Sequence, residues 1–158
     1  MKPTRLLIMG ILSASCATKD ADQAETSAEV SGADPAYVLE ALDAAALPRG
    51  ECGMILWTLD DDRPSPIFRY VAGKSGEIKF NGATIALTRS ETSGASGFGV
   101  FERQVFRGED GIAVRVDMRF SLGFDGGSYL ERAIVAVESP GGWRSVSPAA
   151  GIAGCRAS

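Results

Sequence analysis

Hydrophobic and polar residues alternate along much of the chain after residue 50, with the period of two that is typical of half-buried β-strands. The clearest run is residues 112–121, in which Ile, Val, Val, Met and Phe alternate with Ala, Arg, Asp, Arg and Ser. The other stretches predicted as strands are 54–59, 67–72, 77–80, 83–88, 98–106, 129–138 and 143–146. Seven to eight short strands joined by tight turns predict a mainly β fold, either a small antiparallel barrel or a sandwich.

Turn and loop signals separate these strands. Asn81-Gly82 lies between two of them and is the strongest short hairpin signal, and residues 125–128, Asp-Gly-Gly-Ser, predict a second turn. Two segments lack the alternation, namely the Ser- and Gly-rich residues 90–97 and residues 148–154, and both are predicted to be loops. Residues 90–97 are either a flexible connection or a protruding loop whose hydroxyls and amides enter a partner's groove.

One helix is expected before the strands, over residues 34–47. Asp34 suits the N-cap and Pro35 the first helical position, and Pro48 and Gly50 end the run. The residues that share one face at helical spacing are Val38, Leu39, Leu42, Ala45 and Ala46. We expect this face to pack against the chain's own domain, with docking on a partner as the alternative.

The first sixteen residues have the arrangement of an export signal. Two basic residues precede a short apolar run at residues 6–12, and small residues then lead to Cys16. The run is shorter than the roughly 20 apolar residues that cross a bilayer. The segment resembles the lipobox of bacterial lipoproteins, although Ser13 stands where that family has Leu, Val or Ile. The resemblance implies a lipid on Cys16 and attachment to a membrane; cleavage after Ala17, which removes the cysteine, is the alternative.

The chain is therefore divided into four expected parts. Residues 1–16 are the signal peptide, 17–33 a polar and disordered tether, 34–47 the helix and 50–158 the β domain. Because Ala17, not Asp, follows the cysteine, the lipoprotein resemblance implies the outer membrane, with the domain facing the periplasm or the surface. A soluble periplasmic or secreted protein is the alternative.

Composition excludes several classes of function. The formal net charge of −4 opposes binding to nucleic acid, which needs clustered basic residues. The chain contains no histidine, which excludes Ser-His-Asp and Cys-His catalysis and histidine-ligated zinc. Apart from Cys16, the only cysteines are Cys52 and Cys155, and in an oxidising compartment such a pair is expected to form a disulfide.

The acidic residues offer little chemistry. Glu102 and Glu131 lie in predicted strands and could act as a catalytic carboxylate pair only at a suitable separation, so a carboxylate hydrolase is a weak alternative. Asp60-Asp61-Asp62 has the oxygen ligands that calcium prefers, but it is better interpreted as an acidic turn. We expect no enzyme activity, no metal and no cofactor.

Arginines gather in two predicted strands. Arg115 and Arg119 flank Asp117 in one of them, and Arg103 and Arg107 lie in the preceding one. Arginines gathered on one barrel face could bind carboxylates or phosphates. Alternating charges on a solvated face give the same pattern and are the favoured interpretation.

Two segments are similar to the membrane-bound inhibitors of c-type lysozyme. Residues 95–100, Ala-Ser-Gly-Phe-Gly-Val, stand where that family has a Ser-Gly-Ser-Gly-Ala-Arg-Tyr loop, and residues 106–110 stand for its aromatic-x-Lys-Gly-acidic stretch. The resemblance implies that the Ser96 hydroxyl enters the enzyme, that Arg107 faces its catalytic carboxylates, and that Ser93 lies in the same binding loop. Phe-Gly-Val replaces Ala-Arg-Tyr, and Arg replaces Lys.

The opening of the β domain, Glu-Cys-Gly-Met at residues 51–54 followed by Leu56-Trp57, also resembles a group of uncharacterised exported bacterial proteins. This likeness implies no function. The leading hypothesis is a non-enzymatic envelope lipoprotein that binds an unknown partner, and a lysozyme inhibitor is the alternative.

Overall fold

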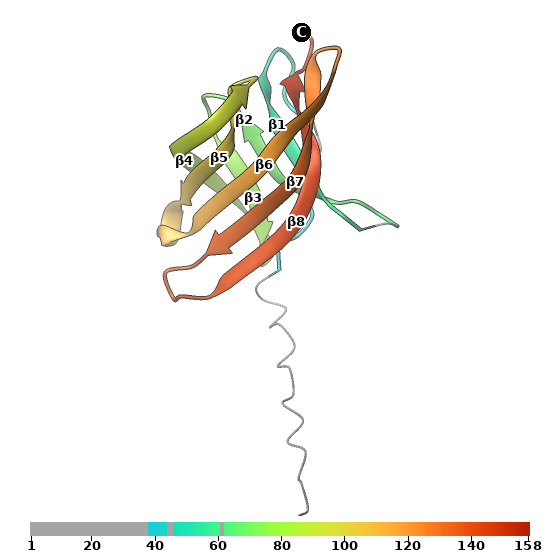
Figure 1. Ribbon diagram of the computed structural model, residues 1–158. Helices are drawn as coiled ribbons and strands as arrows, with labels where there is room; N and C mark the ends of the chain where they lie inside the picture. Colours follow the sequence, from blue (N-terminus) through green and yellow to red (C-terminus); the bar gives the residue numbers. More distant parts are fainter. Residues whose placement is uncertain (1–37, 44–45, 61) are drawn as a thin grey trace, which may run out of the picture. The chain divides into compact units, whose positions relative to one another are not determined.

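The computed structural model describes residues 38–43, 46–60 and 62–158, and this part of the chain forms a closed barrel of antiparallel strands (Figure 1). The strands are β1 (Cys52–Thr58), β2 (Pro66–Val71), β3 (Gly76–Phe80), β4 (Ala83–Gly97), β5 (Val100–Gly108), β6 (Ala113–Phe124), β7 (Gly127–Glu138) and β8 (Arg144–Cys155). Each strand pairs with the next in the chain, and β8 returns to pair with β1. The predicted mainly β fold is confirmed, and of its two alternatives the barrel is the one observed.

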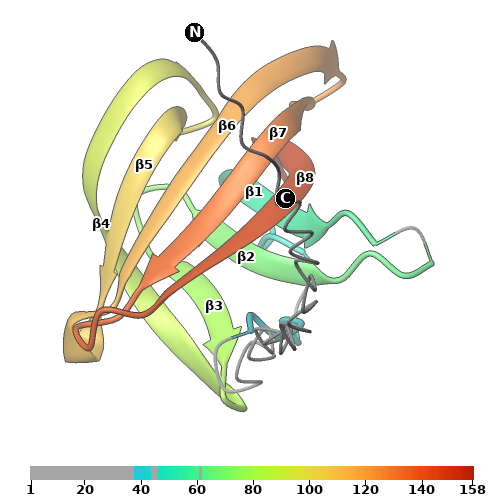
Figure 2. The ribbon, with the colours of Figure 1, turned by 60° about the horizontal axis from the view of Figure 1, so that its bottom comes forward.

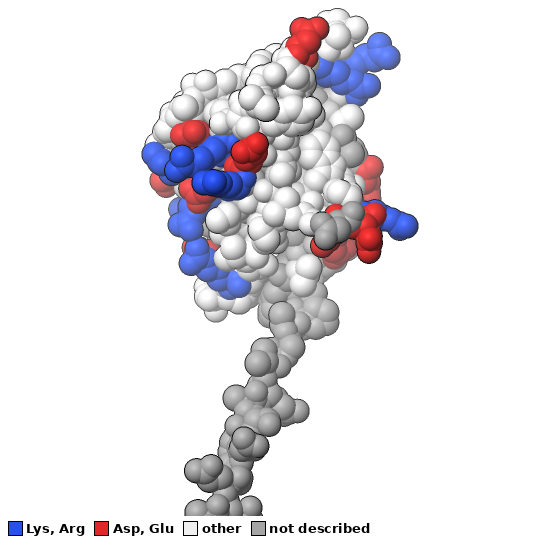
Figure 3. Space-filling model, turned by 45° about the vertical axis from the view of Figure 1, so that its right-hand side comes forward, with Lys and Arg blue, Asp and Glu red and all other residues white. Residues whose placement is uncertain are grey.

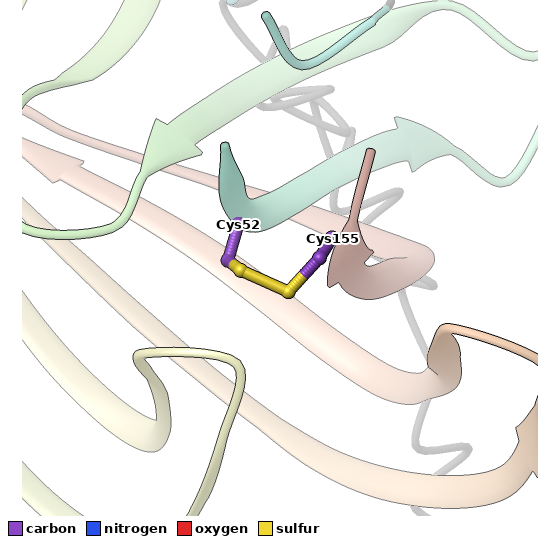
Figure 4. The surroundings of a disulfide bond; sticks show 2 residues. All are labelled: Cys52 and Cys155. Carbon is purple, nitrogen blue, oxygen red and sulfur yellow. A yellow bond between two sulfur atoms is a disulfide. The ribbon is translucent and has the colours of Figure 1, made fainter. Parts of the chain in front are cut away.

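The first and last strands close the barrel. They pair from Cys52 opposite Cys155 to Thr58 opposite Ala149, and the two cysteines form the predicted disulfide (Figure 4). The crosslink joins positions that are 103 residues apart in sequence. It therefore holds together the pair of strands with the greatest sequence separation in the barrel.

Apolar side chains from all eight strands fill the interior. At its centre, the Phe106 ring meets those of Phe68 and Tyr70 edge-on, with centroids 5.1 and 5.2 Å apart. The other large buried members of this core are Met54, Leu56, Ile67, Ile78, Leu87, Val100, Val114, Val116, Met118, Leu130, Val135 and Val137. The interior is thus occupied by the protein's own side chains.

Both segments predicted as loops belong to strands. β4 continues through residues 90–97 and pairs with β5 as far as Gly97 opposite Val100. Register shifts between Arg89 and Glu91 and again between Ser93 and Ser96 interrupt the alternation, which is why the sequence pattern ends early.

The second segment that was predicted as a loop, residues 148–154, is the end of β8. Its small residues permit close pairing with β1. A Cβ on Gly151 would lie only 2.1 Å from the carbonyl oxygen of Ile55. Glycine here serves the close approach of two strands and does not mark a loop.

Residues 38–43 cover the place where β2 and β3 separate (Figure 2). Glu40 N–H donates to the Lys79 carbonyl at 2.9 Å, and Leu42 N–H donates to the Pro66 carbonyl at 2.7 Å. The side chains of Leu39 and Leu42 are buried. Residues 38–43 contain no helix and instead hydrogen-bond to the backbone groups that β2 and β3 leave open.

Residues 34–37 and 44–45 of the predicted helix lie outside the described residues. The predicted signal peptide and tether, residues 1–33, also lie outside them. The part of the chain that the structure describes has no helix long and apolar enough to cross a membrane.

The Asp43→Asn substitution is expected to lower the pKa of Lys79 toward its ordinary value of 10.5. The Asp43 carboxylate accepts a hydrogen bond from Lys79 Nζ at 2.9 Å, and this bond and its charge raise the pKa of the lysine. The raised pKa means that the pair stabilises the fold below pH 10.5 and that this contribution is lost as the pH rises through the folded-state pKa.

An NMR titration of the Lys79 side chain measures this shift. Glu40→Gln is the matched control, because Glu40 raises the pKa of the same lysine only through a weaker charge interaction. An unchanged Lys79 titration in Asp43→Asn would contradict the observed contact.

Beside the β4–β5 turn, Arg89 closes one end of the core. Its Nη1 donates to the Gly99 carbonyl at 2.7 Å and to Gln104 Oε1 at 3.1 Å. The guanidinium carbon lies 5.0 Å from the Tyr70 ring centroid and 5.3 Å from that of Phe101. Arg89 thus satisfies the buried Gln104, and we assign it a structural role.

Candidate functional site

Arginines from three adjacent strands meet on the outside of the barrel. Arg103 on β5 lies opposite Asp117 on β6, and Arg119 on β6 lies opposite Glu131 on β7. Arg132 follows Glu131 in a bulge of β7, and its side chain is exposed. The fold therefore brings together Arg103 and the Arg115–Arg119 row, as the sequence suggested.

A surface depression of about 290 Å³ lies within this group. It is lined by Glu102, Arg103, Asp117, Met118, Arg119 and Arg132, and we call it the arginine hollow. The buried Met118 forms part of its lining. The exposed guanidinium groups of Arg103, Arg119 and Arg132 surround it.

Some charges of this region are paired within the protein. Arg115 Nε lies 3.0 Å from Asp117 Oδ2, and Arg103 Nε donates to Ser93 Oγ at 3.0 Å. Asp117 and Arg115 are thereby paired with each other, and Arg103 is held toward β4. The surface salt bridge contributes little to stability, but it lowers the negative charge that Asp117 presents to the hollow.

The other two acidic residues are also engaged. Glu102 Oε2 accepts a hydrogen bond from Ala95 N–H at 3.3 Å, and Glu131 Oε1 accepts one from Ser121 Oγ at 2.7 Å. Among the described residues, no hydrogen bond or ion pair occupies the side chains of Arg119 and Arg132. These two guanidinium groups are thus available to a ligand.

The two predicted catalytic carboxylates have separate surroundings. Glu102 lines the hollow, whereas Glu131 bonds to Ser121 on the neighbouring strand. In the acidic turn, Asp60 and Asp62 are exposed in the β1–β2 connection, which projects from the barrel (Figures 1 and 2), and Asp61 lies outside the described residues. Within the described part of the chain, no group of acidic or cysteine side chains is arranged to hold a metal.

The three residues of the predicted inhibitor loop are spread along the β4–β5 hairpin. Ser93 faces Arg103, and Ser96 pairs with Phe101 near the turn. Arg107 pairs with Thr88 at the far end of the hairpin. Six residues of extended strand separate the levels of Phe101 and Arg107, or about 20 Å. Ser96 and Arg107 are therefore not brought together at one point, and Arg107 lies outside the arginine hollow.

A face without charged side chains adjoins the arginines. Ile134 on β7 lies opposite Asp117 on one side and opposite Pro148 of β8 on the other. The outward residues of this face are Trp57, Tyr129, Ile134, Val146, Pro148, Ala150 and Ile152. Figure 3, in which β8 comes forward, shows an extensive pale surface with basic and acidic side chains gathered beside it.

Comparisons with known protein families, with curated proteins and with solved structures found no match. The candidate site therefore depends on geometry alone.

Sequence reasoning missed Arg132. The signal was present in the pair Glu131-Arg132, two consecutive charged residues between the buried Leu130 and Ala133. A strand that keeps both apolar residues inside must insert one extra residue between them, which is a bulge.

Proposed function

We propose that this protein is an exported, lipid-anchored and non-enzymatic binding module that recognises its partner with the outer surface of the barrel. The observation that supports this mode of binding is the filled interior, in which Phe106, Phe68 and Tyr70 occupy the centre. The surfaces that we propose as binding sites lie outside instead, in the arginine hollow and the uncharged face beside it. A rigid barrel with a disulfide at its closure presents such a surface at low ordering cost.

The anchor in this proposal is Cys16. Its support is the lipobox-like segment and the basic and apolar residues before it. Two or more acyl chains on one cysteine would give stable membrane attachment, since each buried methylene adds about 0.8 kcal/mol. The barrel would then act close to a membrane surface.

Replacing Cys16 with Ser is expected to move the protein from the membrane fraction to the soluble fraction of the envelope. The acyl chains have no attachment point in this variant, and the β domain is unaltered. Fractionation followed by immunoblotting measures the change, and Ser13→Ala, which keeps the cysteine, is the matched control.

An intact mass of the wild-type protein from its native envelope completes the test. A mass that begins at Cys16 and includes acyl chains supports the anchor. A mass that begins at Thr18 would overturn it and leave a free soluble protein.

A further inference from the structure

Arg132 has a backbone conformation that arginine does not favour. Its φ is +52°, in the left-handed region, where glycine is accommodated without a steric penalty. The bulge requires this conformation, because two residues of β7 oppose one residue of β8 between the pairs Leu130–Gly151 and Ala133–Ala149. Glycine would thus serve the fold better than arginine at this position.

The guanidinium group of Arg132 makes no polar contact within the described part of the chain. Within the described residues it has neither a hydrogen bond nor an ion pair, and it is exposed beside the arginine hollow. Strained residues that bulges direct outward are common at functional sites. The guanidinium of Arg132 is thus free to contact a molecule outside the protein.

The charges of the hollow indicate the class of that ligand. Asp117 is paired with Arg115, and Glu102 accepts a backbone hydrogen bond, whereas Arg119 and Arg132 have no partner among the described residues. The hollow is lined by three arginines and two carboxylates, so it is cationic even though Glu102 keeps its charge, and Arg119 and Arg132 are its two guanidinium groups available to a multivalent anion. A phosphate monoester carries about −1.5 to −2 at pH 7 and has three acceptor oxygens, whereas one carboxylate carries a single charge.

We propose that the arginine hollow binds a phosphate monoester group, with Arg119 and Arg132 as its two main donors and Arg103 at the rim. This inference rests on the proposed outer-surface mode of binding and names the chemistry that the surface recognises. Planar guanidinium groups donate two parallel hydrogen bonds to phosphate oxygens. The phosphate group would belong either to a soluble metabolite or sugar or to a lipid headgroup.

An amide NMR titration of the full mature chain with glycerol 3-phosphate at low ionic strength tests this proposal. We expect shifts at Met118, Arg119 and Arg132, and a dissociation constant at least about tenfold larger in Arg132→Gly. Glycine tolerates the backbone conformation at this position, so the variant should be at least as stable as the wild type. Arg107→Gln is the matched control, since Arg107 is exposed but outside the hollow.

Arg119→Gln provides a second variant that leaves the residues of the β7 bulge unchanged, and it should weaken binding to a similar extent. Glucuronate tests the ligand class and should bind more weakly than glycerol 3-phosphate. Equal affinity for the two anions, or equal affinity of wild type and both hollow variants, would overturn the assignment.

Bicelles of phosphatidylcholine with and without phosphatidic acid distinguish the two sources of phosphate. Shifts in the hollow that need phosphatidic acid and are lost in Arg132→Gly support a lipid headgroup, whereas shifts with glycerol 3-phosphate alone support a soluble ligand. No shift with either probe would overturn phosphate binding. That result would not contradict the proposed lipid anchor at Cys16, because the fractionation of Cys16→Ser is an independent measurement.

Discussion

Replacing Cys52 and Cys155 together with Ser is expected to lower the free energy of unfolding by about 4–5 kcal/mol. The disulfide closes a loop between positions 103 residues apart, and a crosslink over that span removes a large part of the conformational entropy of the unfolded chain. It also joins two directly paired residues of β1 and β8, the strands whose pairing closes the barrel. We therefore expect a loss close to the value from the chain-entropy model.

Urea unfolding of the double variant and of the oxidised wild type measures this difference. The reduced wild type is the control, and it should unfold at nearly the same urea concentration as the double Ser variant. The slope of the free energy against urea should rise in both, since the uncrosslinked unfolded chain exposes more surface. Equal midpoints for the oxidised and reduced wild type would show that the pairing of β1 with β8 is stable without the crosslink.

The sequence predicted a mainly β fold, either a barrel or a sandwich, because most of its strands alternate cleanly. In β6, residues 113–120 place one side chain in two inside, and the Asn81-Gly82 turn joins β3 to β4 as expected. The ends of β4 and β8 could not be predicted in the same way. Bulges interrupt the alternation in β4, and close strand approach selects small residues such as Gly151 in β8. Both depend on a neighbouring strand that is distant in sequence.

Only part of the candidate site could be predicted, because the rest also depends on strand pairing and bulges. The spacing of Arg115, Asp117 and Arg119 places them on one face of a strand, and pairing with β5 adds Arg103 but leaves Arg107 elsewhere. Arg132 enters the site only because β7 has an extra residue relative to both of its neighbours. Strand period alone does not reveal which face a bulged residue occupies.

The Phe106→Ala substitution is expected to lower the free energy of unfolding by about 3–5 kcal/mol. The Phe106 side chain is fully buried and lies between the rings of Phe68 and Tyr70 at the centre of the barrel. Removing it takes away apolar contacts and both edge-on ring interactions, and the strands around it are hydrogen-bonded to neighbours that limit collapse. Gly76, whose Cα faces the ring, is too small to fill the space.

Phe124→Ala is the matched control for this variant. Phe124 is 40% exposed at the end of β6 and its ring lies beside Gly127 and 5.1 Å from the Tyr129 ring centroid, so its loss should cost no more than about 1.5 kcal/mol. Urea unfolding compares the two. Equal losses of unfolding free energy in the two variants would mean that the centre of the barrel is not tightly packed. The interior could then accommodate a ligand. A large loss confined to Phe106→Ala supports a filled interior and directs the search for partners to the outer surface.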